Sequence, residues 1–253
     1  DLSKATDQQS FQTANTTMEG LTRIDEDGKV QPGVAESWET SEDGLTWTFK
    51  LRKNSTWSNG TPVTAHDFEY SWKRTLTPET ASEYSYIMAD IVGSSTKEIE
   101  ANGVDGVGVK ALDDYTLEVK LNRPVAYFAE LVSFQVFFSQ NQAFVESCGD
   151  AYGSAADKQL YNGPFTLTSW KMEDQFTMEK NPNYWDAANV KLNKINTKVV
   201  KDTGAEVSLY EDGQIDRAGL SSDYVDKYKD SKEFHTRDVA SVFMLQVNGG
   251  NNK

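Results

Sequence analysis

Alternation of hydrophobic and polar residues predicts several β-strands along this chain. Trp47, Phe49 and Leu51 alternate with polar residues directly after an Asp-Gly turn, and a period of two is typical of a half-buried strand. The same pattern around turn residues predicts hairpins at 38–52, 107–121 and 164–181, and single strands at 195–201 and 238–248. The segment 11–24 is mixed, but it lies close to a strand pattern.

A helical spacing of hydrophobic residues predicts a helix at 65–76. Phe68, Trp72 and Leu76 recur every four residues on one face, and Thr64 precedes them as an N-cap. Further helices are expected after Pro124, at 203–210 behind the capping-box pair Thr203 and Glu206, and at 221–231. Strands and helices interleaved in this way predict a mixed α/β (α+β) fold.

Acidic residues outnumber basic residues. The 253 residues include 25 Lys and Arg but 39 Asp and Glu, which gives a net charge of −14. This balance argues against a nucleic-acid partner, because phosphate groups need a basic surface. Like charge also keeps copies of a chain apart, so we expect a monomer. No apolar run approaches the roughly 18 residues of a membrane span.

Candidate catalytic and metal-binding residues are few. Asp202, Thr203 and Gly204 match the active-site triplet of aspartic proteases, but that chemistry needs two carboxylates that share a proton, and the sequence holds one such triplet. A symmetric dimer would have to supply the second, whereas Thr203 is also well placed as a helix cap. One Cys and two distant His provide no metal site. We therefore expect no catalytic residue, no metal and no cofactor.

A longer signal comes from the order of several sequence blocks. EGLTRIDEDGKVQPGVAESWE at 19–39 is followed by DGLTWTFKLRKNSTWSNGTPVTAHDFEYSWKR at 43–74. Four shorter blocks follow in order: TASEYSYI at 80–87, YNGPFTLTSW at 161–170, KNPNYWDA at 180–187 and LYEDGQID at 209–216. Together these blocks resemble the extracellular oligopeptide-binding lipoproteins of bacterial ABC importers, which are solute-binding proteins of family 5.

The resemblance implies one lobe of the type II periplasmic-binding-protein fold. Domain I would be discontinuous and comprise residues 1–31 and 150–253, with domain II inserted between them at 32–149. Domain III, the second lobe of such proteins, would begin near the end of this sequence, so we expect it to be missing from this chain. The two lobes of the family close around an extended peptide.

The implied mechanism has a physical basis. A buried main-chain N–H or C=O group without a partner costs about 1–3 kcal/mol. Pairing an extended peptide with an edge strand satisfies these groups whatever its side chains are. By resemblance the pairing strand is Glu19-Gly20-Leu21-Thr22, in which Gly20 would let the ligand backbone come close because it has no Cβ.

Other ligand contacts are also implied by the resemblance. Tyr86 would face the cleft. The loop that touches the peptide would contain Leu220, Ser221 and Ser222, and the strand that enters the hinge would contain Phe243 and Met244. Two alternatives stay open from the residues alone. Gly20 could be an ordinary strand bulge instead of a point of close approach for the ligand, and Tyr86 could be a packed core ring instead of a cleft-facing one.

The function implied by the resemblance is that of a substrate-binding component and not of an enzyme. It would capture oligopeptides and deliver them to an ABC permease in the membrane. The full-length protein would be located on the extracellular face of the bacterial cytoplasmic membrane, held there by a lipid anchor, or in the periplasm. Binding of nickel or an oligosaccharide, or a role as a peptide-pheromone receptor, is an alternative within the same family. An aspartic-type protease is the alternative from a different class.

Overall fold

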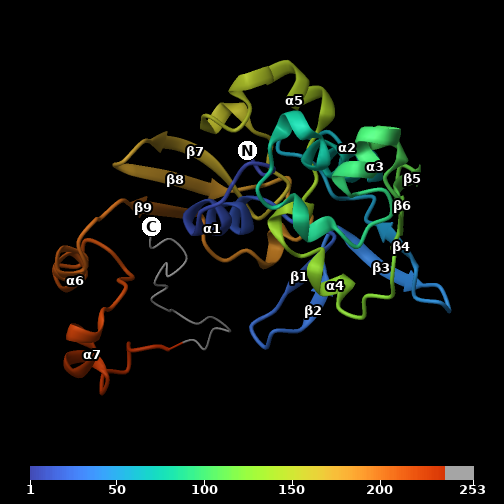
Figure 1. The fold of residues 1–253 in the computed structure, drawn as a ribbon. Coiled ribbons are helices and arrows are strands. Elements are labelled where there is room, and N and C mark those ends of the chain that lie inside the picture. The colour runs from blue at the N-terminus through green and yellow to red at the C-terminus, as the bar shows by residue number, and fades with distance from the viewer. Residues whose placement is uncertain (237–253) are drawn as a thin grey trace, which may run out of the picture. The chain divides into compact units, whose positions relative to one another are not determined.

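The computed structural model describes residues 1–236. The chain forms two compact units, Asp1–Lys198 and Val199–Lys253, and the second is described as far as residue 236. Figure 1 shows the elements in chain order. The domain boundaries expected from the sequence, after residues 31 and 149, both fall within the first unit, and they stay a prediction.

The first unit contains a four-stranded antiparallel sheet. Its order is β3-β4-β6-β5, with β3 at Ala35–Thr40, β4 at Thr46–Leu51, β6 at Thr116–Lys120 and β5 at Val109–Asp113. Phe49 pairs with Trp38 on one side and with Leu117 on the other, and all three belong to the hydrophobic core or pack against it. Both hairpins were predicted from their period of two and are confirmed, and they lie side by side in the sheet (Figure 1).

Helix α2, Ala65–Leu76, contacts this sheet at β5 and β6. Phe68 and Trp72 are fully buried, as the helical spacing predicts. A capping box closes the first turn, in which the Asp67 carboxylate accepts from the N–H of Thr64 at 2.8 Å. The predicted helix and its cap are both confirmed. The prediction succeeded because the hydrophobic face and the capping residues indicate the same helix boundaries.

A three-stranded antiparallel sheet of order β7-β8-β9 lies in the same unit. Its strands are β7 at Phe165–Lys171, β8 at Gln175–Lys180 and β9 at Lys194–Lys198. The predicted hairpin and the strand after it are therefore confirmed. A two-stranded sheet joins β1, Thr22–Ile24, to β2, Val30–Pro32. Gly28 in the turn between them has a φ of 77°, which glycine adopts without strain.

The N-terminal segment departs from the prediction. Much of the stretch expected near a strand pattern forms helix α1, Gln8–Thr17, and Asp7 caps it through the N–H of Ser10 at 2.8 Å. Hydrophobic residues are sparse on this helix, so its sequence shows no clear helical period. The apolar stretch after Pro124 forms a single turn, α4 at Phe128–Leu131. Further short elements include α3 at Thr96–Asn102, α5 at Gln142–Cys148 and the 3-10 helix η2 at Ser85–Met88.

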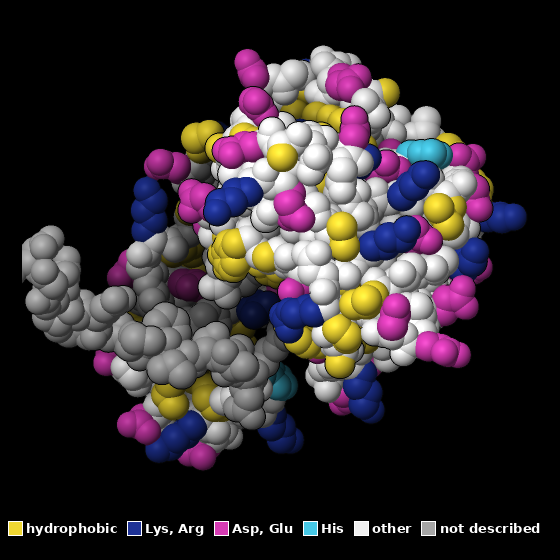
Figure 2. Space-filling view, turned by 45° about the vertical axis from the view of Figure 1, so that its right-hand side comes forward, with side chains coloured by type: hydrophobic (Ala, Val, Ile, Leu, Met, Phe, Trp, Pro, Cys, Tyr) yellow, Lys and Arg dark blue, Asp and Glu magenta, His cyan; other side chains and the backbone are white. Residues whose placement is uncertain are grey.

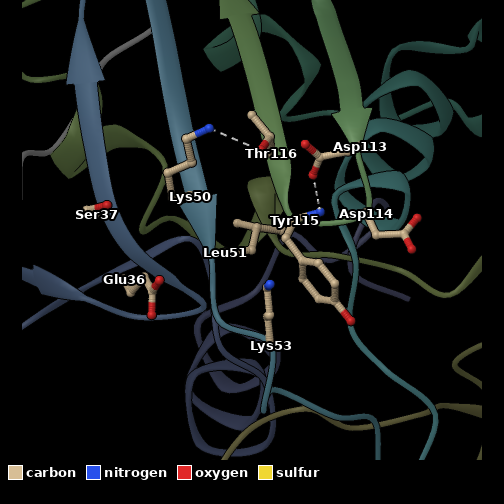
Figure 3. Close-up of a pocket in the computed structure, with 9 residues that line it drawn as sticks. All are labelled: Glu36, Ser37, Lys50, Leu51, Lys53, Asp113, Asp114, Tyr115 and Thr116. Carbon is tan, nitrogen blue, oxygen red and sulfur yellow. Dashed lines mark hydrogen bonds between the residues drawn. The ribbon is translucent and has the colours of Figure 1, made fainter.

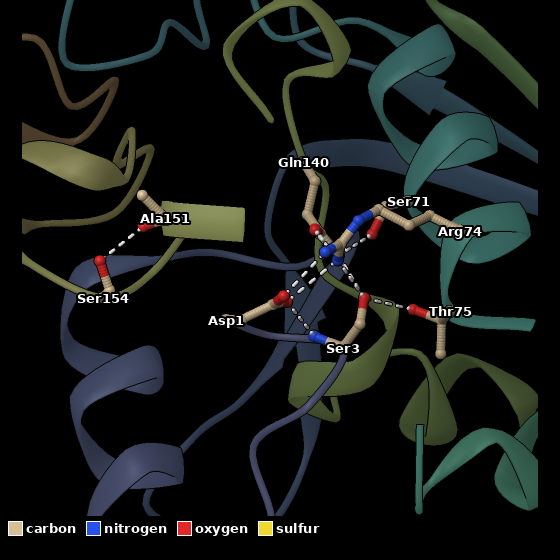
Figure 4. A network of polar contacts seen from close by, with 8 residues as sticks. All are labelled: Asp1, Ser3, Ser71, Arg74, Thr75, Gln140, Ala151 and Ser154. Atoms are coloured by element: carbon tan, nitrogen blue, oxygen red, sulfur yellow. Dashed lines mark hydrogen bonds and ion pairs between the residues drawn. The ribbon is translucent and has the colours of Figure 1, made fainter. Parts of the chain in front are cut away.

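A buried polar network fastens the first residues of the chain to α2 (Figure 4). The Arg74 guanidinium donates to the Asp1 carboxylate at 2.7 and 3.0 Å. It also donates to Ser3 Oγ at 3.0 Å and to Gln140 Oε1 at 2.9 Å. The Gln140 amide in turn donates to the hydroxyls of Ser3 and Ser71. Because each of these polar groups has a partner, the network holds the segment before α1 in one place.

The second unit, taken by itself, contains α6 at Thr203–Glu211 and α7 at Ser222–Tyr228. Both helices were predicted and are confirmed. The N-cap of α6 is Asp202, whose carboxylate accepts from the N–H of Ala205 at 2.8 Å, so the cap expected at Thr203 is wrong by one residue. In the described part of the chain no helix is long and apolar enough to cross a membrane.

Candidate functional site

The predicted pairing segment, residues 19–22, lies in the core of the first unit, and all four residues are buried. Its carbonyl groups already have partners on one side. Gly20 O accepts from the N–H of Val34 at 2.9 Å, and Leu21 O accepts from the N–H of Ala35 at 3.0 Å. These two carbonyls are therefore engaged with the protein's own chain.

The side chain of Asn162, which is only 1% exposed, forms two hydrogen bonds with the main chain at the start of the same segment. Its side-chain oxygen accepts from the N–H of Glu19, and its amide donates to the carbonyl of Glu19, both at 3.0 Å. The Thr22 hydroxyl donates to the carbonyl of Ala129 at 2.6 Å. The segment is thus bonded within the protein, and its pairing with a peptide stays a prediction that this packing does not favour.

Gly20 is required by packing inside the protein. A Cβ atom at this position would lie 2.6 Å from the Phe138 ring and 3.1 Å from the carbonyl oxygen of Val132, and the first distance is well below carbon–carbon contact. The close approach that the resemblance assigns to a ligand backbone is made here by Phe138. Gly20 lies before the first residue of β1, so the register of β1 with β2 does not test the alternative of a strand bulge, which stays open.

The Glu19 carboxylate is the centre of what we call the Glu19 cluster: Glu19, Arg23, Arg52, Tyr184 and Trp185. It accepts from the Tyr184 hydroxyl at 2.6 Å and from the Trp185 indole N–H at 2.5 Å. An Arg23 nitrogen lies 3.5 Å from the same carboxylate. Burial raises the pKa of Glu19, while the two hydrogen bonds and the charges of Arg23 and Arg52 act in the opposite direction.

Trp185 has two guanidinium groups against its ring. The centre of the Arg52 guanidinium lies 3.7 Å from the ring centroid, and that of Arg23 lies 5.4 Å away, both within cation–π range. The Arg52 Nε also donates to the carbonyl of Gly33 at 2.6 Å, which fixes the guanidinium plane. Only Glu19 of the cluster was predicted as a site residue, because Tyr184 lies 165 positions away and no local spacing links the two.

Tyr86 is 67% exposed and belongs to η2. Its ring stacks on Tyr84 with centroids 6.0 Å apart. Tyr84 in turn contacts Phe11 at 5.3 Å and Phe134 at 5.6 Å. The alternative of a packed core ring is therefore wrong for Tyr86. An exposed ring supported by another ring offers a firm apolar surface, and the cleft-facing role of Tyr86 stays a prediction.

The predicted loop at 220–222 lies in the second unit and leads into α7. Leu220 and Ser221 are half-buried, Ser222 is exposed, and Ser221 is the N-cap of the helix. The predicted strand with Phe243 and Met244 lies outside the described residues. The ligand-binding roles of all five residues stay predictions.

A surface hollow of about 670 Å³ lies at one end of the four-stranded sheet (Figure 3). Its lining comprises Glu36, Ser37, Lys50, Leu51, Lys53, Asp113, Asp114, Tyr115 and Thr116. Lys50 donates to the Thr116 hydroxyl at 3.2 Å, and Asp113 accepts from the N–H of Tyr115 at 2.8 Å. The lining mixes lysines with carboxylates and includes none of the predicted site residues, so it defines no particular ligand.

Other chemistries have little support in the described part of the chain. The Asp202 carboxylate is engaged in capping α6. No group of three His, Cys, Asp or Glu side chains among the described residues is placed to hold a metal ion. Figure 2 shows charged side chains of both signs interspersed over the face in view, with no basic surface gathered there.

The chain matches the family of bacterial extracellular solute-binding proteins, family 5 Middle, over residues 29–253. It therefore belongs to this family. Within it, the chain is similar to oligopeptide-binding proteins, which are non-enzymatic binding proteins. The interpretation of Asp202 as a protease residue is accordingly dropped, and the mixed α/β fold is that of part of such a protein.

Individual relatives define the extent of the similarity. The oligopeptide-binding protein OppA of Bacillus subtilis is 38% identical over 249 residues, which are 96% of this chain and 46% of that protein. The dipeptide-binding protein DppE of the same organism is 37% identical over 94% of this chain and 44% of its own length. The structure of Listeria monocytogenes OppA bound to peptide matches with a TM-score of 0.88 and 41% identity, over 92% of this chain and 46% of that one. The chain thus spans slightly less than half the length of these relatives.

Proposed function

We propose that this chain is part of the substrate-binding component of a peptide ABC transporter, which captures extended oligopeptides between two lobes and delivers them to a membrane permease. The observation that carries the proposal is the match to Listeria monocytogenes OppA bound to peptide, at 41% identity and a TM-score of 0.88. The two relatives from Bacillus subtilis, named for oligopeptide and dipeptide binding, support it.

Main-chain pairing suits a receptor for peptides of many sequences. Each buried N–H and C=O group of the guest needs a partner, and a protein main chain supplies partners independently of the guest's side chains. In the first unit the exposed Tyr86 ring is the predicted site residue most open to a guest. Residues 19–22 would contribute to peptide binding only through main-chain groups that are not already hydrogen-bonded within the protein. The proposal therefore does not depend on them.

The proposed location is outside the cytoplasmic membrane. The matching family is described as extracellular, and the OppA relative from Salmonella typhimurium is described as periplasmic. A lipid anchor on the complete protein would hold it near its permease. Such an anchor makes physical sense for a chain of net charge −14, because anionic lipid does not attract it.

A peptide-pheromone receptor is a narrower second candidate. The structure of the pheromone receptor PrgZ matches with a TM-score of 0.88 and 34% identity over 92% of this chain. Import and sensing share the step of peptide capture, and they differ in whether the bound peptide is transported or serves as a signal. Nickel and oligosaccharides remain alternative solutes, and a binding experiment separates them from peptides.

Titration calorimetry on the complete natural protein that contains this chain tests the proposal. Short peptides, a nickel salt and cello-oligosaccharides are titrated separately, and we expect heat of binding from peptides. Binding of nickel or a sugar without binding of any peptide would reject the peptide assignment and leave family membership intact. Residues 1–253 alone should bind peptide far more weakly, because one lobe covers only one face of a guest.

A further inference from the structure

The Glu19 cluster lies across the border between the two predicted domains. Glu19, Tyr184 and Trp185 belong to predicted domain I, whereas Arg52 and its partner Gly33 belong to predicted domain II. The stack of Arg52 on Trp185, at 3.7 Å, is therefore a contact between the two. The indole N–H of the same Trp185 donates to the Glu19 carboxylate at 2.5 Å.

Further hydrogen bonds cross the same border close to this stack. The Thr56 hydroxyl donates to the carbonyl of Asn183 at 2.8 Å, and the Asn183 amide donates to the carbonyl of Ser58 at 3.0 Å. The N–H of Ser58 donates to the carbonyl of Tyr161 at 2.7 Å. The segment after β4 is thus fastened along the loop that carries Tyr184 and Trp185, and both lie within one compact unit.

We propose that Glu19 is a positioning residue of the peptide-binding lobe: as the hydrogen-bond acceptor for Trp185, it orients the indole on which Arg52 stacks and so fixes predicted domain II against predicted domain I. The inference rests on the proposed function for its affinity measurement only. Glu19 itself is 5% exposed and touches no ligand in this scheme.

The property of residue 19 that this role requires is a hydrogen-bond acceptor for the Trp185 N–H. The Trp185 N–H can only donate, so a side chain without an acceptor leaves it without this partner in a part-buried site. The Tyr184 hydroxyl can donate or accept, and it also receives a hydrogen bond from Arg23 at 3.3 Å. An amide at position 19 can therefore accept from Trp185 through its oxygen in the place of Oε2, while its NH2 group in the place of Oε1 donates to the Tyr184 hydroxyl. A thioether of similar length cannot replace the carboxylate in this way.

The test compares Glu19→Met with Glu19→Gln, and the exposed Glu26→Gln serves as a charge-matched control. In the complete protein we expect Glu19→Met to weaken peptide binding about tenfold, the equivalent of one lost charged or buried hydrogen bond. Glu19→Gln should stay within about threefold of wild type, and the control should not differ from it. Equal affinities for the Met and Gln variants would overturn the proposal.

Two further measurements keep the test decisive. Hydrogen exchange on the 253-residue chain should show lost protection of the Ser58 N–H in Glu19→Met and retained protection in Glu19→Gln, with or without a peptide ligand. If the wild type binds no peptide, the proposed function fails while this exchange result still decides the positioning role. If Glu19→Met does not fold, Trp185→Phe takes its place, since it keeps a ring for Arg52 but lacks the N–H; unchanged affinity and protection in that variant would contradict the proposal.

The pH profile separates orientation by Glu19 from mere filling of space. The charged and titratable groups around Glu19 are Tyr184, Arg23, Arg52 and, through Arg23, Asp186, and they are unchanged in Glu19→Gln. We expect the advantage of the wild type over Glu19→Gln in unfolding midpoint to shrink as pH rises, because burial raises the pKa of Glu19. An identical pH profile in both proteins would mean that the carboxylate does not act as proposed.

Discussion

Two regions of the first unit differ in how completely their groups are satisfied. Around Glu19 the side chain is 5% exposed, and its carboxylate and main chain all have hydrogen-bond partners within the protein. Around Tyr86 the rings stack on one another, and the outermost remains 67% exposed. A region with complete internal bonding sets stability, whereas an exposed ring on a firm support is free to meet a ligand. The contrast predicts large effects on unfolding from the first region, and effects on binding without loss of stability from the second.

Gly20→Ala should give the largest loss of stability. The new Cβ would lie 2.6 Å from Phe138, in a site enclosed by the core. Overpacking of this kind costs up to about 3 kcal/mol of unfolding free energy. Urea unfolding of the 253-residue chain measures it, and Gly20→Ala combined with Phe138→Leu should recover part of the loss. A single variant within about 0.5 kcal/mol of wild type would show that the Glu19 region is not tightly packed.

Asn162→Ala should be the next most damaging change. It leaves the N–H and the carbonyl of Glu19 buried without the two partners at 3.0 Å. We expect a loss of about 2 kcal/mol in unfolding free energy, measured by the same urea titration. The exposed Asn189→Ala is the matched control and should change stability little. Equal effects of the two substitutions would contradict the picture of a completely bonded region.

The pH dependence of stability provides a smaller effect with a definite sign. Burial raises the pKa of Glu19, so the folded protein binds this proton more tightly than the unfolded chain does. The corresponding stability is fully present below the ordinary glutamate pKa and is lost as pH rises through the folded-state pKa. The advantage of wild type over Glu19→Gln in unfolding free energy should therefore shrink as pH rises above the ordinary glutamate pKa of about 4.

The half-buried Asp25 supplies the opposite sign as a control. Hydrogen bonds, chiefly from the main chain of Lys29, lower the pKa of Asp25. Its contribution to stability is present above the ordinary aspartate pKa and is lost as pH falls. The advantage of wild type over Asp25→Asn should therefore grow with pH. Differences that follow pH in the same direction for both variants would show that the burial of Glu19 does not control its titration.

Local patterns predicted those parts of the fold that depend on neighbours in sequence. Trp47 and Phe49 alternate with polar residues, and Phe68 and Trp72 share a helix face, so strand β4 and helix α2 were found with their faces. Helix α1 was missed because polar residues dominate it and its cap at Asp7 has no hydrophobic period behind it. The Glu19 cluster depends on the pairing of distant segments, which no window of sequence contains.

The resemblance identified the family from a series of sequence blocks, but it did not determine which single residues within those blocks are buried. The family match covers residues 29–253 and so includes the later part of the block at 19–39. Within that block, Gly20 meets Phe138 and not open space, a fact that depends on how the loop before α5 returns to the core. Conversely, nothing in the sequence around Tyr86 separates an exposed ring from a buried one. A motif fixes which residues are present, and tertiary packing decides which of their groups remain free.

Tyr86→Ala should have the smallest effect on stability of all these substitutions. Its ring is 67% exposed, so its removal should change the unfolding free energy by no more than about 0.5 kcal/mol. In the complete protein the same substitution should weaken peptide binding about fivefold, because an aromatic contact contributes on the order of 1 kcal/mol. Tyr127→Ala, at a tyrosine that is 52% exposed, is the matched control and should leave the affinity unchanged. If Tyr86→Ala instead lowered stability and left affinity intact, the ring would belong to the packing of Tyr84 and Phe134, and the distinction between a bonded scaffold and an open binding surface would not hold for this lobe.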